Sequence, residues 1–199
     1  MLEQRIQQQF FDSADLQYQT AESLARPIAD AAQALTGCLT AGGKLLVAGL
    51  GGGSALAQHV CATFVGRYER ERPGLAALAL GSDSTLLGSL AASEGIEQVF
   101  AKQVQALGQS GDVLLLLLDA PGAQAAFEAA IAVAHAREMV VVVLGGRPAG
   151  ALTPRLGETD VMVMLAHDQP ARILELQLLV LHCLCDAVDL QLMGEQDPL

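Results

Sequence analysis

Positive charge is scarce in this chain of 199 residues. Lysine and arginine number 11 against 22 aspartate and glutamate residues, which gives a formal net charge of −11. The only dense basic group is Arg67, Arg70 and Arg72. A surface that binds duplex DNA or RNA needs clustered cations opposite the phosphates. We therefore expect no direct binding of nucleic acid, although an acidic surface suits a basic protein partner.

Long hydrophobic runs are also absent. The most apolar segments, Val113–Leu118 and Met139–Leu144, have the length of strands, whereas a membrane-spanning helix needs about 20 apolar residues. The first ten residues include Glu3, Arg5 and several glutamines, which is not the pattern of a signal peptide. The four cysteines form no CxxC pair. We expect a cytoplasmic protein with no membrane contact, whose cysteines are reduced core residues.

Apolar side chains, in contrast, are abundant. Hydrophobic residues make up 52% of the chain and charged residues only 17%, and the mean hydropathy is +0.39. A monomer of this size normally covers its surface with more polar residues. The composition therefore predicts that the chain buries a second surface against copies of itself.

The spacing of the apolar residues predicts one α/β domain over residues 1–199. Helical spacing over residues 1–42 predicts an N-terminal pair of helices that serves oligomerisation, with Pro27 in the first turn of the second helix. The expected strands of the core, residues 43–199, are 44–48, 76–80, 113–118, 139–144 and 161–165, and its expected helices are 54–68, 84–92, 96–107, 121–136 and 170–192. This alternation is typical of a doubly wound parallel sheet of about five strands flanked by helices. Such a sheet binds ligands at the carboxyl ends of its strands.

A run of glycines follows the first expected strand, with the sequence Gly49-Leu50-Gly51-Gly52-Gly53-Ser54. The backbone N–H groups of such a turn, at the start of a helix, can bind an anion. The same run also suits a strand-to-helix turn that binds nothing. It has neither the lysine of a P-loop nor the spacing of a dinucleotide fingerprint.

A wider set of motifs resembles the phosphoheptose isomerases of the sugar-isomerase (SIS-domain) family. The resemblance begins at the glycine run and continues through Ala57-Gln58-His59. Further matching segments are 66–68, 71–75, 82–83, 99–104, 106–108, 111–114, 171–173 with Glu175, and 182–186. The last segment, His182-Cys183-Leu184-Cys185-Asp186, is most similar to the branch of the DnaA initiator-associating protein (DiaA). The resemblance implies an SIS domain, a homotetramer or at least a dimer, and a sugar-phosphate pocket.

The positions that match the family's metal site are changed. The resemblance implies a site of His59 and His182 with a glutamate and a glutamine, but Thr63 and Leu174 stand at those two positions. Two imidazoles without a carboxylate make a poor zinc site, so we expect no metal and no other cofactor. Thr63 also replaces the implied general base, which leaves His182 as the one candidate catalytic residue. Both histidines equally suit hydrogen-bonded positions in the core or an interface.

The family's phosphate loop is changed further. The aligned residues are Leu118-Asp119-Ala120-Pro121-Gly122-Ala123, and none of them carries a hydroxyl. Asp119 stands where it can cap the following helix and compete with phosphate for the N–H groups there. Like charges about 4 Å apart repel by roughly 4 kcal/mol at an effective dielectric near 20. The resemblance thus implies a vestigial ligand pocket of Gly51, Gly52, Gly53, Ser54, His59, Asp83, Asp119, Arg172, Glu175 and His182.

These changes favour a non-catalytic oligomer of the DiaA type that binds DnaA and promotes its assembly at the replication origin. The alternatives are a phosphoheptose (sedoheptulose 7-phosphate) isomerase, a phosphosugar-binding protein, and a degenerate relative with another partner. Leu192 and Met193 end the last expected helix beside a polar tail, and we expect them to bind the partner.

Overall fold

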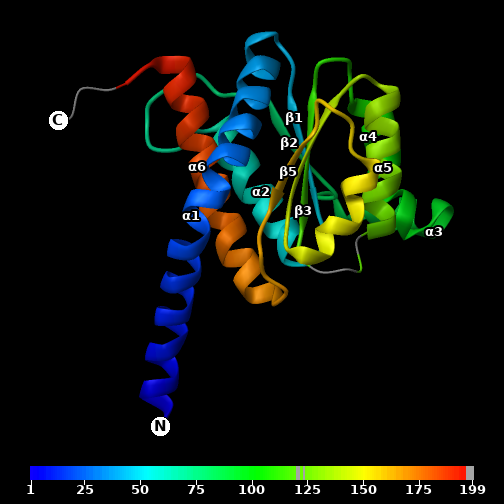
Figure 1. The fold of residues 1–199 in the computed structure, drawn as a ribbon. Helices are drawn as coiled ribbons and strands as arrows, with labels where there is room; N and C mark the ends of the chain where they lie inside the picture. Colours follow the sequence, from blue (N-terminus) through cyan, green and yellow to red (C-terminus); the bar gives the residue numbers. More distant parts are fainter. Residues whose placement is uncertain (120–121, 123, 196–199) are drawn as a thin grey trace.

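The fold is a five-stranded parallel sheet with helices on both faces (Figure 1). The computed structural model describes residues 1–119, 122 and 124–195. The strands are β1 (Leu45–Gly49), β2 (Ala77–Leu80), β3 (Val113–Leu118), β4 (Val140–Gly145) and β5 (Val161–Met164), in the spatial order β2-β1-β3-β4-β5. All neighbouring strands pair in parallel, so the expected fold class is confirmed.

The helices form two layers, one on each face of the sheet. One layer contains α1 (Leu2–Thr40), α2 (Gly52–Val65) and α6 (Pro170–Met193), and the other contains α3 (Ser84–Glu94), α4 (Val99–Leu107) and α5 (Gln124–Ala136). The 3-10 segment η1 (Ile96–Gln98) precedes α4. A second 3-10 segment, η3 (Arg147–Arg155), lies in a stretch with no expected element.

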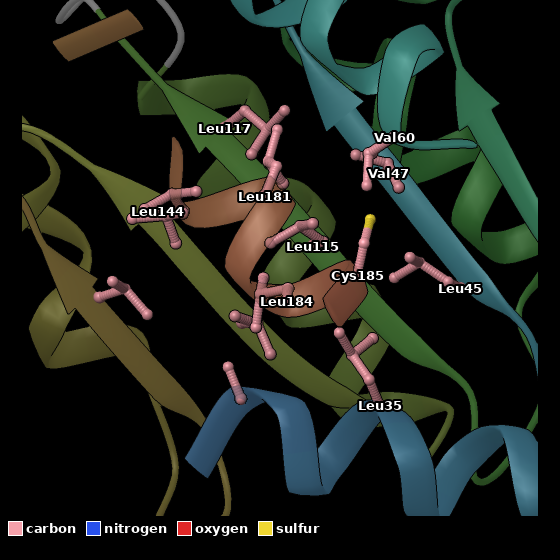
Figure 2. Close-up of a cluster of buried hydrophobic side chains, with 14 of the residues drawn as sticks. Leu35, Leu45, Val47, Val60, Leu115, Leu117, Leu144, Leu181, Leu184 and Cys185 are labelled. Carbon is pink, nitrogen blue, oxygen red and sulfur yellow. The ribbon is translucent and has the colours of Figure 1, made fainter. Parts of the chain in front are cut away.

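The strands are continuous apolar runs because both of their faces are covered. In β1, Leu45 and Val47 pack under α1, α2 and α6, whereas Leu46 and Ala48 pack under the opposite layer. Figure 2 shows the first of these clusters, where Leu181, Leu184 and Cys185 of α6 meet side chains of β1, β3 and β4. Both helical layers are thus fixed to the sheet by dry side-chain packing.

The N-terminal region is one continuous helix of 39 residues rather than the expected pair. Pro27 lies inside α1, where it removes one backbone donor from the helix. The helix continues because Leu24, Ala31, Ala32 and Leu35 on both sides of the proline are anchored in the same core cluster. Tertiary packing therefore outweighs the break that the proline predicts.

The strand order reverses direction between β1 and β3. The chain passes from β1 to β2 on one side and then returns to place β3 on the other side of β1. At such a switch point the two following loops diverge and leave a crevice at the carboxyl ends of the strands. The glycine run after β1 and Asp119 after β3 therefore come to the same place.

No helix in the described part of the chain is long and apolar enough to cross a membrane. The apolar surface is concentrated on the first half of α1, which extends away from the body of the domain (Figure 1). Phe10 is 73% exposed, and Leu2, Ile6, Phe11 and Tyr18 are also exposed. An apolar helix with no neighbour of its own on one side is suited to packing against another copy.

We predict that this half of α1 mediates self-association. The wild type is expected to be a dimer or larger at micromolar concentration, and Ile6→Ser with Phe10→Ser is expected to give a smaller species, because each buried large apolar side chain contributes about 1.5–3 kcal/mol. Light scattering measures both. Ile96→Ser, which changes an exposed isoleucine on the other face of the sheet, is the control and should leave the assembly intact. A monomeric wild type would contradict this prediction.

Candidate functional site

Helices α2 and α6 lie side by side and run in the same direction. Their side chains meet at successive levels: Leu174 lies over Gly52, His182 contacts His59, and Cys185 contacts Thr63. Both sets of residues increase in number together, which fixes the parallel direction. The line of contact between the helices, from the glycine run to Thr63, is the α2/α6 seam, and His59 and His182 meet within it.

The two histidines are in direct contact across the seam. Their Nε2 atoms are 3.0 Å apart, and the ring centroids lie 5.3 Å apart in an edge-on arrangement. The ring of Tyr68, in the segment that follows α2, lies 5.4 Å from that of His182. One Nε2 must donate and the other accept, so the pair holds a proton between the rings. An imidazole can release or accept a proton near neutral pH, so such a pair can perform acid–base chemistry.

The glycine run forms the tight turn that the sequence predicts. Gly51 has a φ of +60°, which favours glycine, and α2 begins at the next residue. A Cβ atom at Gly52 would lie 2.5 Å from Cδ1 of Leu174 and 3.2 Å from Oδ2 of Asp119. An apolar side chain and a carboxylate thus cover the turn at which an anion would approach.

Asp119 faces the glycine turn across the switch point. Its carboxylate lies beside the start of α2, where the free N–H groups favour a negative charge. The predicted role of Asp119 as the cap of α5 stays a prediction, since residues 120, 121 and 123 of that loop lie outside the described residues. The contact with the glycine turn by itself supports competition between this carboxylate and an anionic ligand.

Two of the predicted pocket residues face α1 instead of the seam. Arg172 donates to both carboxylate oxygens of Glu175 at 2.7 Å and to the side chain of Gln9 at 2.5 Å. Ser13 donates to Glu175 at 2.8 Å, and these residues with Phe10 line a cavity of about 220 Å³. Partial burial acts to raise the pKa of Glu175, but hydrogen bonds from Arg172 and Ser13 and the charge of Arg172 together lower it. The cluster fixes α1 to the start of α6.

Asp83 also has a local structural role. Its carboxylate accepts from the backbone N–H groups of Thr85 at 2.8 Å and Leu86 at 3.0 Å, so it is the N-cap of α3.

The two residues predicted to bind a partner lie at the end of α6. Leu192 packs against the first core cluster, and Met193 is 53% exposed. Half of the predicted partner-binding pair therefore belongs to the domain's own packing.

The residues of the seam do not fit a metal ion. Zinc holds nitrogen ligands at about 2.0–2.1 Å and is normally completed by further anionic or nitrogen ligands. Here the two imidazoles bond to each other, and Thr63 and Leu174 supply neither a carboxylate nor an amide. Over residues 1–119, 122 and 124–195, no three histidine, cysteine or acidic side chains gather into such a site.

The sequence reasoning missed a buried ion pair next to the seam. Nε of Arg72 donates to Oδ1 of Asp189 at 2.5 Å, and both side chains are only 1% exposed. A signal for this pair was present in the sequence, because Asp189 is an acidic residue at a helix position where the spacing predicts a core residue.

Two thiols on these helices are unreactive, since burial raises the pKa of Cys61 to about 12 and that of Cys185 to about 11.

Comparison with known proteins identifies the class. The SIS domain family matches residues 9–146. The phosphoheptose isomerase of Methylibium petroleiphilum is 55% identical over 99% of this chain and 98% of its own length, and that of Thiobacillus denitrificans is 45% identical over 98% and 99%. The structure of phosphoheptose isomerase GmhA from Neisseria gonorrhoeae superposes with a TM-score of 0.88 at 35% identity, covering 95% of this chain and 99% of that one. A phosphoheptose isomerase from Francisella tularensis gives 0.89 at 36% identity, over 95% and 98%.

The fold and the matched segment place this chain in the SIS-domain family. Within it, the full-length similarity shows that the chain belongs to the phosphoheptose isomerase family. The expectation of a non-catalytic, DnaA-binding module is wrong, because these full-length relatives are phosphoheptose isomerases. The DiaA branch was inferred from the few residues at 182–186, and such a short segment weighs little against a whole chain.

The contact of Leu174 with the glycine turn can be tested by a double-mutant cycle. Gly52→Ala is expected to destabilise the fold by about 1–3 kcal/mol, because its methyl group would overlap Leu174. Leu174→Ala should recover most of that loss in the double variant, as measured by urea unfolding. Gly88→Ala is the control, since a Cβ there meets nothing within 4 Å and should not destabilise α3. Additive effects at positions 52 and 174 would contradict the contact.

The lowered pKa of Glu175 predicts a pH-dependent contribution to stability. A carboxyl group whose pKa falls on folding stabilises the fold above its unfolded value of about 4.3, and this contribution is lost as the pH falls through the folded pKa. Glu175→Gln should therefore be less stable than the wild type at pH 7, with a difference that disappears in strong acid. Urea unfolding across this range measures it. Glu22→Gln, which removes an exposed carboxylate of α1, is the matched control for the loss of one surface charge.

Proposed function

We propose that this chain is a phosphoheptose isomerase, acting on sedoheptulose 7-phosphate. The observation that carries the proposal is the contact of His59 with His182 at the α2/α6 seam, in a chain that is 55% identical over its full length to a phosphoheptose isomerase. The reaction interconverts a ketose and an aldose by moving a proton between adjacent carbon atoms. It requires one group to collect this proton and a group to protonate the carbonyl oxygen.

The histidine pair can supply both functions. The ring with a free Nε2 accepts the carbon-bound proton, and the ring that carries a proton on Nε2 donates it to the carbonyl oxygen. A ketose presents a carbonyl group next to a carbon that carries a hydroxyl group. When the substrate binds, the two Nε2 atoms contact these neighbouring groups instead of each other. In the second half of the reaction, the ring that took the carbon-bound proton returns it to the neighbouring carbon. The other ring takes the hydroxyl proton of the first carbon, which becomes the aldehyde, so both rings regain their starting protonation. No step is assigned to Thr63, since a hydroxyl is too weak a base to collect a carbon-bound proton at neutral pH.

A second candidate function is the binding of a phosphosugar without its conversion. It is favoured by Thr63, which stands at the position of the implied general base and contacts Cys185, so the chain has no carboxylate there to collect a carbon-bound proton. Calorimetry measures the binding of sedoheptulose 7-phosphate and an isomerisation assay measures its turnover. The two measurements together distinguish the candidates. A protein that binds sedoheptulose 7-phosphate and does not isomerise it would support the second candidate over the first.

We predict that His59→Gln and His182→Gln each lower the turnover of sedoheptulose 7-phosphate by about 100-fold or more, which is the lower end of the range for general acid–base catalysis. The double variant should be little worse than either single one, because the two rings act as a unit. His135→Gln on α5, on the other face of the sheet, is the matched control and should retain wild-type turnover. Full activity in both single variants would exclude the pair as the acid–base groups.

A further inference from the structure

Arg72 is the most completely buried cation that the described residues contain in an ion pair. Its side chain is 1% exposed and contacts three separate pieces of the chain. All of these contacts lie just beyond the histidine level of the α2/α6 seam. The mechanism proposed above does not use this residue, and burying a guanidinium group is costly unless its donors are satisfied.

The guanidinium group first closes the end of α2. It donates from Nη2 to the carbonyl oxygen of Thr63 at 3.0 Å, and from Nη1 to that of Phe64 at 2.9 Å. These carbonyls belong to the last turn of the helix, which has no helical partner for them. A positive charge is also favourable at this end of the helix dipole. Arg72 therefore fixes the turn of α2 that follows His59.

The same group shapes the segment that carries Tyr68. Nη1 also reaches the carbonyl oxygens of Gly66 at 3.4 Å and Pro73 at 3.2 Å, one on each side of this tyrosine. The backbone N–H of Leu75 donates to Phe64 at 2.8 Å and closes the segment. This folded-back course places the ring of Tyr68 beside His182.

The third contact fixes α6. Asp189 lies two helical turns after His182, and its Oδ1 accepts from Nε of Arg72 at 2.5 Å. The remaining oxygen, Oδ2, is buried without a hydrogen-bond partner, so this carboxylate depends on Arg72 for its stabilisation. A shift of α6 along α2 by a single residue would break this bond. The ion pair thus defines the register in which the two histidines meet.

We propose that Arg72, with Asp189, is a positioning residue for the histidine pair. It holds the end of α2, the Tyr68 segment and α6 in the single arrangement that brings the two Nε2 atoms to 3.0 Å. A lysine cannot substitute, because one ammonium group lacks the planar fork that serves two helices at once. As a role in catalysis, the inference rests on the proposed isomerase function, while its structural content concerns the contact between the rings.

The test compares Arg72→Gln, Arg72→Lys and Asp189→Asn with the wild type in the full chain. Each variant is expected to lower kcat for sedoheptulose 7-phosphate by about 100-fold, the effect of a misplacement near 1 Å, while KM changes less than about threefold. In the wild type, the side-chain 15N resonances of His59 and His182 should show one unprotonated Nε2 that accepts a hydrogen bond from the other ring. In the variants this signature should disappear. Arg72→Lys, which keeps the charge, should recover thermal stability but not kcat or this signature.

A matched control separates positioning from simple loss of stability. Lys44 and Asp112 form another largely buried pair, with Nζ to Oδ2 at 2.5 Å, between the residues just before β1 and β3 and outside the α2/α6 seam. Asp112→Asn is expected to lower Tm about as much as Asp189→Asn and to leave kcat and the histidine resonances unchanged. If the Arg72 variants do not fold, Asp189→Asn, which preserves the shape of the side chain, decides the question.

Two failures are distinguishable. If the wild type shows no turnover, the isomerase proposal fails, and the 15N spectra alone decide whether Arg72 positions the rings. If the wild type is active and folded Asp189→Asn or Arg72→Lys keeps both kcat and the histidine resonances, the positioning role is overturned. Equal losses of kcat in Asp112→Asn would also overturn it, because any destabilised variant would then behave alike.

Discussion

The parallel contact between α2 and α6 is the constraint on which the candidate site depends. Both helices rest on the same face of the sheet, so their separation and tilt are set by the apolar side chains beneath them. What remains free is the slide of one helix along the other. The contact of Leu174 with Gly52 limits this slide at the start of α2, and the bond of Asp189 to Arg72 limits it beyond the end of α2. The histidine contact lies between these two limits.

The five strands of the sheet, and the glycine turn at the carboxyl end of β1, could be predicted from the sequence. Val113–Leu118 and the other apolar runs are strands because helices cover both of their faces, and burial on both faces leaves continuous apolar segments of strand length. The glycine turn was also predictable, because a φ of +60° at Gly51 strongly favours that residue. The resemblance to the phosphoheptose isomerases implied that His59 and His182 share a site, but the bond between their rings depends on a helix register that no local pattern contains.

The errors of sequence reasoning have a common physical origin in contacts between distant residues. Pro27 predicts a break in the N-terminal helix, yet core packing on both sides carries the helix through. Arg172 and Glu175 read as pocket residues, but they bind Gln9 and Ser13 of α1, more than 160 positions earlier in the chain. Arg72 and Asp189 are separated by 117 positions. Each of these side chains has a plausible local role, and only the assembled fold selects the partner.

The distribution of polarity along the seam bears on how the chemistry works. At the glycine turn, a leucine and a carboxylate cover the backbone that could receive a phosphate, so this part of the seam attracts anions weakly. At the histidine level, proton donors and acceptors remain paired, and beneath it a costly buried charge is fully engaged with backbone carbonyls. If stability were the only requirement, well-packed apolar side chains could replace such a buried ion pair without loss. The ordered polar groups of the seam therefore lie at the histidines and at the ion pair beyond them, and this is the part of the seam on which the proposed acid–base chemistry depends.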